Sequence, residues 1–155
     1  MAYDLAHDLA IVQKMAGELD RYLREPELWW PLGGQMPRLT IGGLLLRRHR
    51  LLCLAAHTLA LHDALAVFET ARAAWPIHYR DKVTREWKTR SNLLGTLLRD
   101  CEAVRAEKAH GAPIDHWLPA VEQRTILHEL GGDPYAAEAL TSSHRAALAR
   151  LEGRL

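Results

Sequence analysis

Nine histidines in 155 residues make metal binding the first chemistry to test in this sequence. A di-metal site in a helical bundle uses inward carboxylates and two Glu-x-x-His pairs. One such pair is present, Glu107 with His110, and it lies at the end of a predicted helix. His57 and His62 are five residues apart, which does not place them well on one helix face. We therefore expect no metal site and no cofactor, and we interpret His57 and His62 as core or near-core imidazoles.

Nucleophilic catalysis has equally little support. The chain has two cysteines, Cys53 and Cys101, and both fall inside helical apolar patterns. This predicts buried free thiols, not a disulfide or a metal pair, and suits a reducing cytosol. No Gly-x-Ser-x-Gly motif occurs, and Ser91, Ser142 and Ser143 all lie in predicted helices. We expect no catalytic residues. A helical-bundle metal protein or enzyme that uses His57 and His62 is a third hypothesis, after the two developed below.

Residues 25–50 depart furthest from an ordinary amphipathic helix. They contain a Trp pair, three prolines and four glycines, followed by a basic cluster. Trp and Arg are the side chains that most often anchor protein interfaces. The candidate interaction surface consists of Trp29, Trp30, Arg47, Arg48 and Arg50.

Two glycines open the helix predicted after Thr40. Gly42 and Gly43 fit neither the dinucleotide-binding nor the P-loop spacing. A helix N-terminus with small residues can hold an anion. We favour the alternative that these glycines allow another element to pack closely against the helix.

Charge is distributed unevenly along the chain, although the net charge is only +1. Residues 1–30 sum to −3, residues 31–90 to +6 and residues 91–155 to −2. A basic middle interleaved with aromatic residues can grip phosphates and stack on bases. The candidate nucleic-acid patch consists of Arg72, Arg80, Lys82, Arg85, Lys88 and Arg90. The alternative is that the acidic ends fold back and neutralise this segment.

Apolar residues three and four apart predict a first helix over residues 3–24, which Pro26 cannot continue. Residues 25–39 are predicted to form an ordered loop, because their apolar side chains favour burial. A second helix is predicted from Thr40, as N-cap, to Trp75 before Pro76. Its apolar stripe includes Leu59, His62 and Ala66, and its middle is apolar nearly all round, which indicates a central position.

An unbroken helix over residues 40–75 would be about 54 Å long. A compact chain of this size has a radius of gyration of about 15 Å. Either this helix kinks, or it projects and packs against another chain, which would make the protein a homo-oligomer.

A third helix is predicted over residues 79–109, with Val83 and Trp87 on its buried stripe. Opposite charges four residues apart, such as Lys82 and Glu86, are expected on its solvent side.

Two shorter helices complete the prediction. The first covers residues 115–130, has Pro119 in its first turn and ends at Gly131-Gly132, a left-handed cap signal. The second starts at Asp133 as N-cap and runs to Leu151.

Together these features predict one helical domain over residues 1–155, an all-α antiparallel bundle with two long central helices and about three shorter ones. The longest apolar run is too short to span a bilayer and no signal-peptide layout is present, so we expect a cytoplasmic protein without membrane contact. The leading functional hypothesis is a non-enzymatic helical interaction module or accessory subunit that self-associates or binds a protein partner. The alternative hypothesis is a nucleic-acid-binding accessory subunit.

Overall fold

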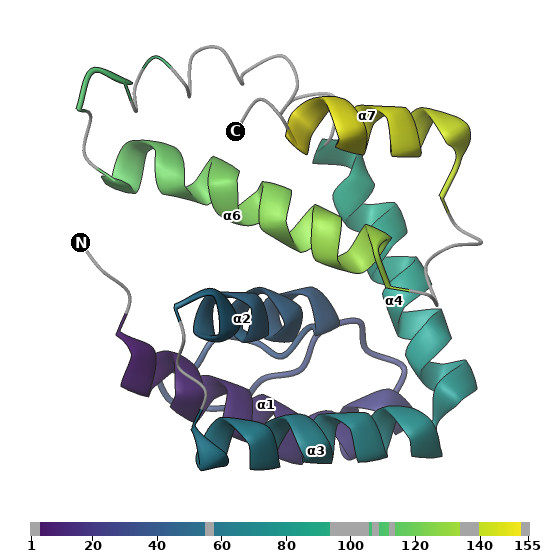
Figure 1. The fold of residues 1–155 in the computed structure, drawn as a ribbon. Helices are drawn as coiled ribbons and strands as arrows, with labels where there is room; N and C mark the ends of the chain where they lie inside the picture. Colours follow the sequence, from purple (N-terminus) through teal and green to yellow (C-terminus); the bar gives the residue numbers. More distant parts are fainter. Residues whose placement is uncertain are drawn as a thin grey trace. The chain divides into compact units, whose positions relative to one another are not determined.

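The computed structural model describes residues 4–54, 58–93, 106, 109–111, 114–133 and 140–152. These residues form helices joined by turns and one ordered linker, and no strand occurs among them (Figure 1). The all-α prediction is therefore confirmed. The chain divides into two compact units, residues 2–86 and residues 87–155. Within the described part of the chain, no helix combines the length and apolar character needed to cross a bilayer.

Helix α1 (Leu5–Arg24) ends at the predicted residue and begins after Asp4, two residues later than predicted. The side chain of Asp4 accepts a hydrogen bond from the His7 N–H at 3.1 Å and so caps the first turn. The helix buries one stripe of mainly apolar residues and ends at Glu25, whose extended backbone leads into Pro26. The buried residues of α1 are Asp8, Ile11, Val12, Met15, Ala16, Leu19, Tyr22 and Leu23.

The linker between α1 and α2, residues 25–40, is ordered as predicted. Trp30 and Leu39 exchange backbone hydrogen bonds of 2.9 and 2.7 Å, and so form an isolated antiparallel bridge. Gly33 and Gly34 turn the chain between them, with φ angles of 85° and 56° that favour glycine. Leu39 is fully buried, which fixes this small hairpin to the helices.

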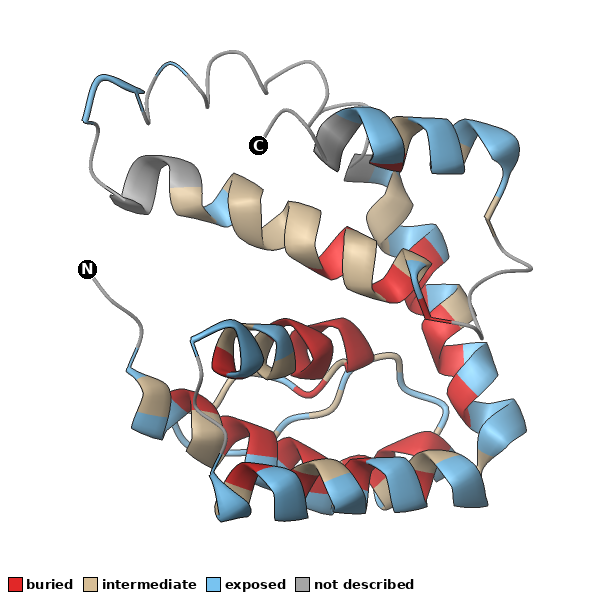
Figure 2. Ribbon diagram, viewed as in Figure 1, coloured by how far each residue is buried: buried red, intermediate tan, exposed pale blue. Residues whose placement is uncertain are grey.

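The prediction of one helix from Thr40 to Trp75 is wrong. The structure has two helices here, α2 (Ile41–Cys53) and α3 (Leu59–Ala74). Thr58 supplies a new N-cap, because its hydroxyl accepts the Leu61 N–H at 3.1 Å. The break allows both helices to pack on α1, which one straight rod could not do (Figure 1). The buried residues of α2 fill its first half, whereas those of α3 recur at spacings of three and four (red in Figure 2).

This break also changes which face of α3 is buried. The expected stripe through Leu59, His62 and Ala66 is exposed. His62 is therefore not a core imidazole. The expectation that the middle of the predicted helix over residues 40–75 is central in the fold is also wrong. The second helix starts its own register at Thr58, so a different face meets α1. The buried residues of α3 are Leu61, Ala64, Phe68 and Ala71.

Helix α4 (Pro76–Arg90) begins three residues earlier than predicted, because Pro76 takes the first helical position directly after the α3 cap at Trp75. It ends at Arg90 and continues as one 3₁₀ turn, η1 (Ser91–Leu93). Residues 94–105, in the rest of the predicted third helix, lie outside the described residues.

In the unit of residues 87–155, α6 (Ile114–Gly131) matches its prediction within a residue at each end. Pro119 lies beyond the first turn, contrary to our expectation. Gly132 is not among the positive-φ glycines of the described residues, so the predicted left-handed cap is wrong. Gly131 instead allows close packing, since a Cβ there would lie 2.9 Å from Leu148 Cδ1 and 3.4 Å from Trp87.

Helix α7 (Ser142–Glu152) begins later than the predicted Asp133. Leu140 and Thr141 are not helical, so the prediction of one helix over residues 133–151 is wrong. Residues 134–139 lie outside the described residues. The Thr141 hydroxyl accepts the His144 N–H at 3.1 Å and caps α7. The His144 ring packs edge-on against Trp87 at 5.4 Å.

Candidate interaction surface and the contacts that organise it

The basic cluster of α2 contacts the protein's own groups. Arg47 Nε lies 3.9 Å and Arg50 Nη1 lies 3.6 Å from Oδ1 of Asp8, whose side chain is 8% exposed. Arg48 lies over the Phe68 ring, 5.7 Å from its centroid. A buried carboxylate needs compensating cations, and two arginines of α2 supply them to α1. These three arginines, predicted to reach a binding surface, therefore contribute to holding α1, α2 and α3 together.

The two linker tryptophans have different environments. Trp29 is 48% exposed, and the Arg38 guanidinium lies 4.0 Å from the centroid of its ring. Trp30 is partly buried, forms the bridge with Leu39 and lies 5.1 Å from the Arg21 guanidinium. Of the five residues predicted to form an interaction surface, Trp29 is the one that presents a large apolar side chain to solvent.

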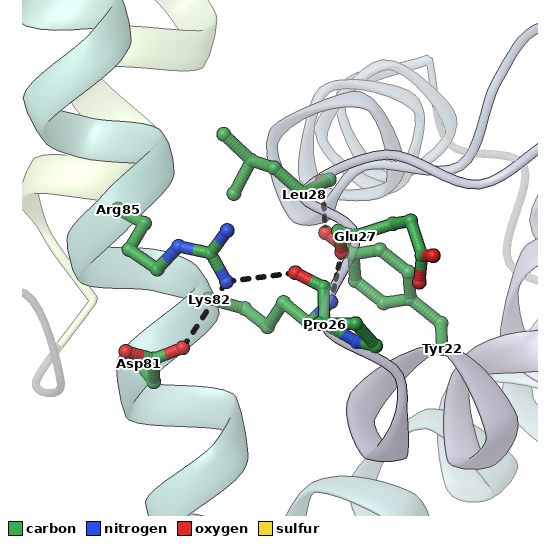
Figure 3. Close-up of polar contacts among 7 residues, drawn as sticks. All are labelled: Tyr22, Pro26, Glu27, Leu28, Asp81, Lys82 and Arg85. Atoms are coloured by element: carbon green, nitrogen blue, oxygen red, sulfur yellow. Dashed lines mark hydrogen bonds and ion pairs between the residues drawn. The ribbon is translucent and has the colours of Figure 1, made fainter.

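Three consecutive backbone carbonyls of the linker accept hydrogen bonds from side chains of α1 and α4 (Figure 3). The donor–acceptor pairs are Arg85 with Pro26, Lys82 with Glu27, and Tyr22 with Leu28. The Arg85 bond is 3.0 Å long, and Arg85 also bonds to the Asp81 carboxylate at 3.3 Å. Carbonyls in a loop that packs against helices need such donors. We call these three donors the linker clamp.

Lys82 is the buried member of the linker clamp, with 2% of its surface exposed. Its Nζ lies 4.1 Å from the centroid of the Tyr22 ring, whose face attracts a cation. Burial away from water and the nearby charge of Arg85 lower the pKa of Lys82 to about 8, although the carboxylates of Glu27 and Asp81 oppose this change. The hydrogen bond from Lys82 to the linker therefore forms at the cost of removing a charged ammonium group from water.

The N-terminus of α2 is occupied by the protein's own acceptors. The Gly42 N–H donates to the Glu86 carboxylate, with N···O distances of 3.0 and 3.2 Å, and the Gly43 N–H donates to Thr40 Oγ1 at 2.9 Å. Glu86 is 2% exposed. A carboxylate here meets both the free N–H groups and the positive end of the helix dipole. An external anion therefore finds the first-turn N–H groups of Gly42 and Gly43 already bonded.

Lys82 and Glu86 were expected on the solvent side of their helix, and this is wrong. Charges spaced four residues apart indicate a common helix face but not what covers it. The linker and the start of α2 cover this face, and Lys82 and Glu86 bond to them.

The predicted nucleic-acid patch is largely engaged within the chain. Arg72 pairs with Glu69 at 2.6 Å, and Arg90 donates to Gln123 at 3.4 Å. Lys82 and Arg85 belong to the linker clamp. Arg80 and Lys88 are exposed. These contacts reduce the charge that this segment offers to phosphates, and nucleic-acid binding stays a prediction.

A groove runs between α1 and α3 on the unit of residues 2–86. Two adjoining cavities of about 310 and 290 Å³ share Ala16, Gly17 and Val67 and together extend from Ala60 to Ala74. At 1.5 Å per residue this is about 21 Å of α3, or four turns. Most of its lining residues are small. The lining residues are Gln13, Ala16, Gly17, Asp20, Ala60, Asp63, Ala64, Ala66, Val67, Thr70, Ala71 and Ala74.

The chemistry of this groove is that of a contact surface. Val67 is 48% exposed, and a Cβ placed on Gly17 would meet no atom within 4 Å. Its ionisable groups are Asp20 and Asp63, and Asp20 already accepts a 2.6 Å hydrogen bond from the Trp75 indole. The groove therefore lacks a paired acid and base but offers a shallow apolar track of helix length.

A further cavity of about 470 Å³ lies between the end of α1 and the first turns of α4. Leu23, Pro26 and Ile77 form its apolar part, and Ile77 is 78% exposed. Charges of both signs surround it, and the Lys82 ammonium bonds to the Glu27 carbonyl. This arrangement stabilises the linker, and the Lys82 ammonium of the cavity already donates to it.

No known protein family, curated protein or solved structure matches this chain.

Sequence reasoning missed two features of the surface. Cys53 is exposed, not buried as predicted, because α2 ends there instead of continuing through an apolar centre. The groove was also missed, although Ala60, Ala64, Val67, Ala71 and Ala74 repeat at spacings of four and three. That spacing of small residues is typical of a helix face that another helix approaches closely. His57, Cys101 and Glu107 lie outside the described residues.

Proposed function

We propose that this chain is a non-enzymatic helical interaction module whose docking surface is the α1–α3 groove. The observation that carries the proposal is this track of small residues, open to solvent over four turns of α3. Small residues let the backbone of a docking helix approach, and the partner helix then buries apolar area along the whole track. The exposed Trp29 ring, stacked with Arg38, supplies a second apolar contact on the same unit.

The simplest partner is a second copy of the chain. Homo-oligomers with two-fold symmetry are the commonest soluble assemblies, and a surface that packs on itself needs no other component. Val67, the largest exposed apolar residue of the groove, would be buried in such a contact.

Gly17 offers a direct test. It is exposed, and a Cβ there would meet no atom within 4 Å, so the side chain of Gly17→Leu has room to extend into the groove without disturbing the fold. Sedimentation at micromolar concentration in EDTA should give a mass above one chain for the wild type and the mass of one chain for Gly17→Leu. Gly17→Ala is the matched control, since a single methyl group leaves most of the track open.

A wild-type protein with the mass of one chain would remove self-association from the proposal. A stoichiometric partner that Gly17→Leu releases and Gly17→Ala retains would then identify the groove as a surface for another protein. Retardation of RNA or DNA at low salt that persists in Gly17→Leu and disappears in Arg80→Glu would favour the nucleic-acid hypothesis instead.

A further inference from the structure

Cys53 and His49 form an exposed thiol–imidazole pair near the end of α2. Cys53 Sγ lies 3.4 Å from Nε2 and 3.9 Å from Nδ1 of His49, and both residues are exposed. They are four residues apart, so both side chains project from one face of the helix. The pair lies in the unit of residues 2–86 and is separate from the residues that line the α1–α3 groove.

The spacing of these two atoms matches that of two ligands on one zinc ion. In a tetrahedral site with Zn–S of about 2.3 Å and Zn–N of about 2.0 Å, sulfur and nitrogen lie about 3.5 Å apart. The observed 3.4 Å between Sγ and Nε2 is close to this separation. Thiolate and imidazole are also the ligand types that zinc prefers.

His49 and Cys53 of one chain make up two of the four ligands that a closed zinc site needs. No group of three or more potential metal ligands occurs among the described residues of a single chain. A two-fold axis repeats any surface pair, so two copies would bring two cysteines and two histidines to one point. Leu52 and Leu54 flank the pair, are 37% and 51% exposed, and would be buried by such a contact.

We propose that Zn²⁺ binds His49 and Cys53 from two copies of this chain and joins them in a dimer. Each thiol loses its proton to solvent as its sulfur–zinc bond forms, and each histidine binds as the neutral imidazole. Binding one ion therefore releases two protons and involves no oxidation or reduction.

The test uses the untagged full chain, reduced and stripped with EDTA, in which Zn²⁺ is titrated while mass and bound metal are measured. In Gly17→Leu, whose filled groove should leave the metal-free protein with the mass of one chain, we expect the mass to rise to twice 17.5 kDa at one zinc per two chains. Co²⁺ in place of Zn²⁺ should give the intense visible absorption of a tetrahedral site and a thiolate-to-metal charge-transfer band. Cys53→Ser and His49→Ala should each abolish the response, and their exposure leaves the fold intact.

Matched controls are Cys101→Ser and His78→Ala, a second cysteine and an exposed histidine, both of which should respond like the wild type. The wild type should bind zinc in the same ratio as Gly17→Leu, which separates this proposal from the groove. Unchanged zinc binding in Cys53→Ser would overturn the site. One zinc per chain, lost in His57→Ala, would overturn the shared site, since the ligands would then come from a single copy.

Discussion

The Glu86 carboxylate of α4 caps the N-terminus of α2, 44 residues away in the chain, by accepting the Gly42 N–H with both of its oxygens. Both groups are buried, so the fold brings the two partners together away from water. A carboxylate at this position bonds to an otherwise unsatisfied N–H group and opposes the positive end of the helix dipole. The same contact explains why the small residues at Gly42 and Gly43 do not present an open anion site.

Replacing Glu86 should destabilise the unit of residues 2–86. Glu86→Ala removes the acceptor and leaves the Gly42 N–H buried without its partner, which should lower the free energy of unfolding by about 2–3 kcal/mol. Glu86→Gln keeps one carbonyl oxygen and should cost about 1 kcal/mol. Urea denaturation followed by circular dichroism measures both. Glu18→Gln, at a partly exposed ion pair with Lys14, is the control and should change stability by less than about 0.5 kcal/mol. Equal effects of Glu18→Gln and Glu86→Ala would contradict the cap.

Lys82 should make stability depend on alkaline pH. Its pKa is about 8 in the folded chain against an ordinary value of 10.5, so between these two values the unfolded chain binds more protons. The free energy of unfolding should therefore rise as the pH increases from 8 to 10.5, by up to about 3 kcal/mol. Because tyrosines and other lysines also titrate there, the quantity to measure is the difference between the wild type and Lys82→Met. Lys88→Met, at an exposed lysine of the same helix, should follow the wild type across this range. A flat difference curve would show that Lys82 titrates normally.

Alanine variants of the two linker tryptophans should have different effects, one on the stability of the fold and the other on self-association. Trp30→Ala removes a partly buried ring next to the bridge with Leu39 and should lower the free energy of unfolding by about 2 kcal/mol. Trp29→Ala removes an exposed ring and should change it by less than about 0.5 kcal/mol, while weakening self-association. Thermal denaturation and sedimentation on the same samples distinguish the two effects. Comparable loss of stability in both variants would place Trp29 in the core.

Replacing each of two helical glycines, Gly17 and Gly131, by alanine should change the free energy of unfolding in opposite directions. Gly17 has open space around it, so Gly17→Ala should raise the free energy of unfolding by up to about 1 kcal/mol through helix propensity. At Gly131 the new methyl group would lie 2.9 Å from Leu148 Cδ1, and relieving that overlap should cost about 1–2 kcal/mol. Chemical denaturation of the two variants and the wild type measures the difference. Stabilisation at Gly131 would mean that Leu148 moves aside without penalty.

The local features of this chain could be predicted from sequence because they depend on neighbouring residues. Thr40 was placed at a helix start by its capping chemistry, and Pro26 and Pro76 at helix boundaries by their missing N–H. The stripe of α1 follows directly from apolar spacing. The all-α class followed from the same patterns.

Other features depended on which surfaces meet in three dimensions. An apolar run that is hydrophobic all round does not reveal whether it forms one helix or two, so the break before Thr58 changed the buried face of α3 and left His62 and Cys53 exposed.

The use of charged residues was likewise decided by the tertiary structure. Arg47 and Arg50 pair with Asp8, Lys82 bonds to the linker and Glu86 caps α2, all across 39 to 55 residues of chain. The sequence gives the sign and the spacing of charged residues. The partner of each charge depends on which backbone groups and opposite charges are buried next to it when the chain folds.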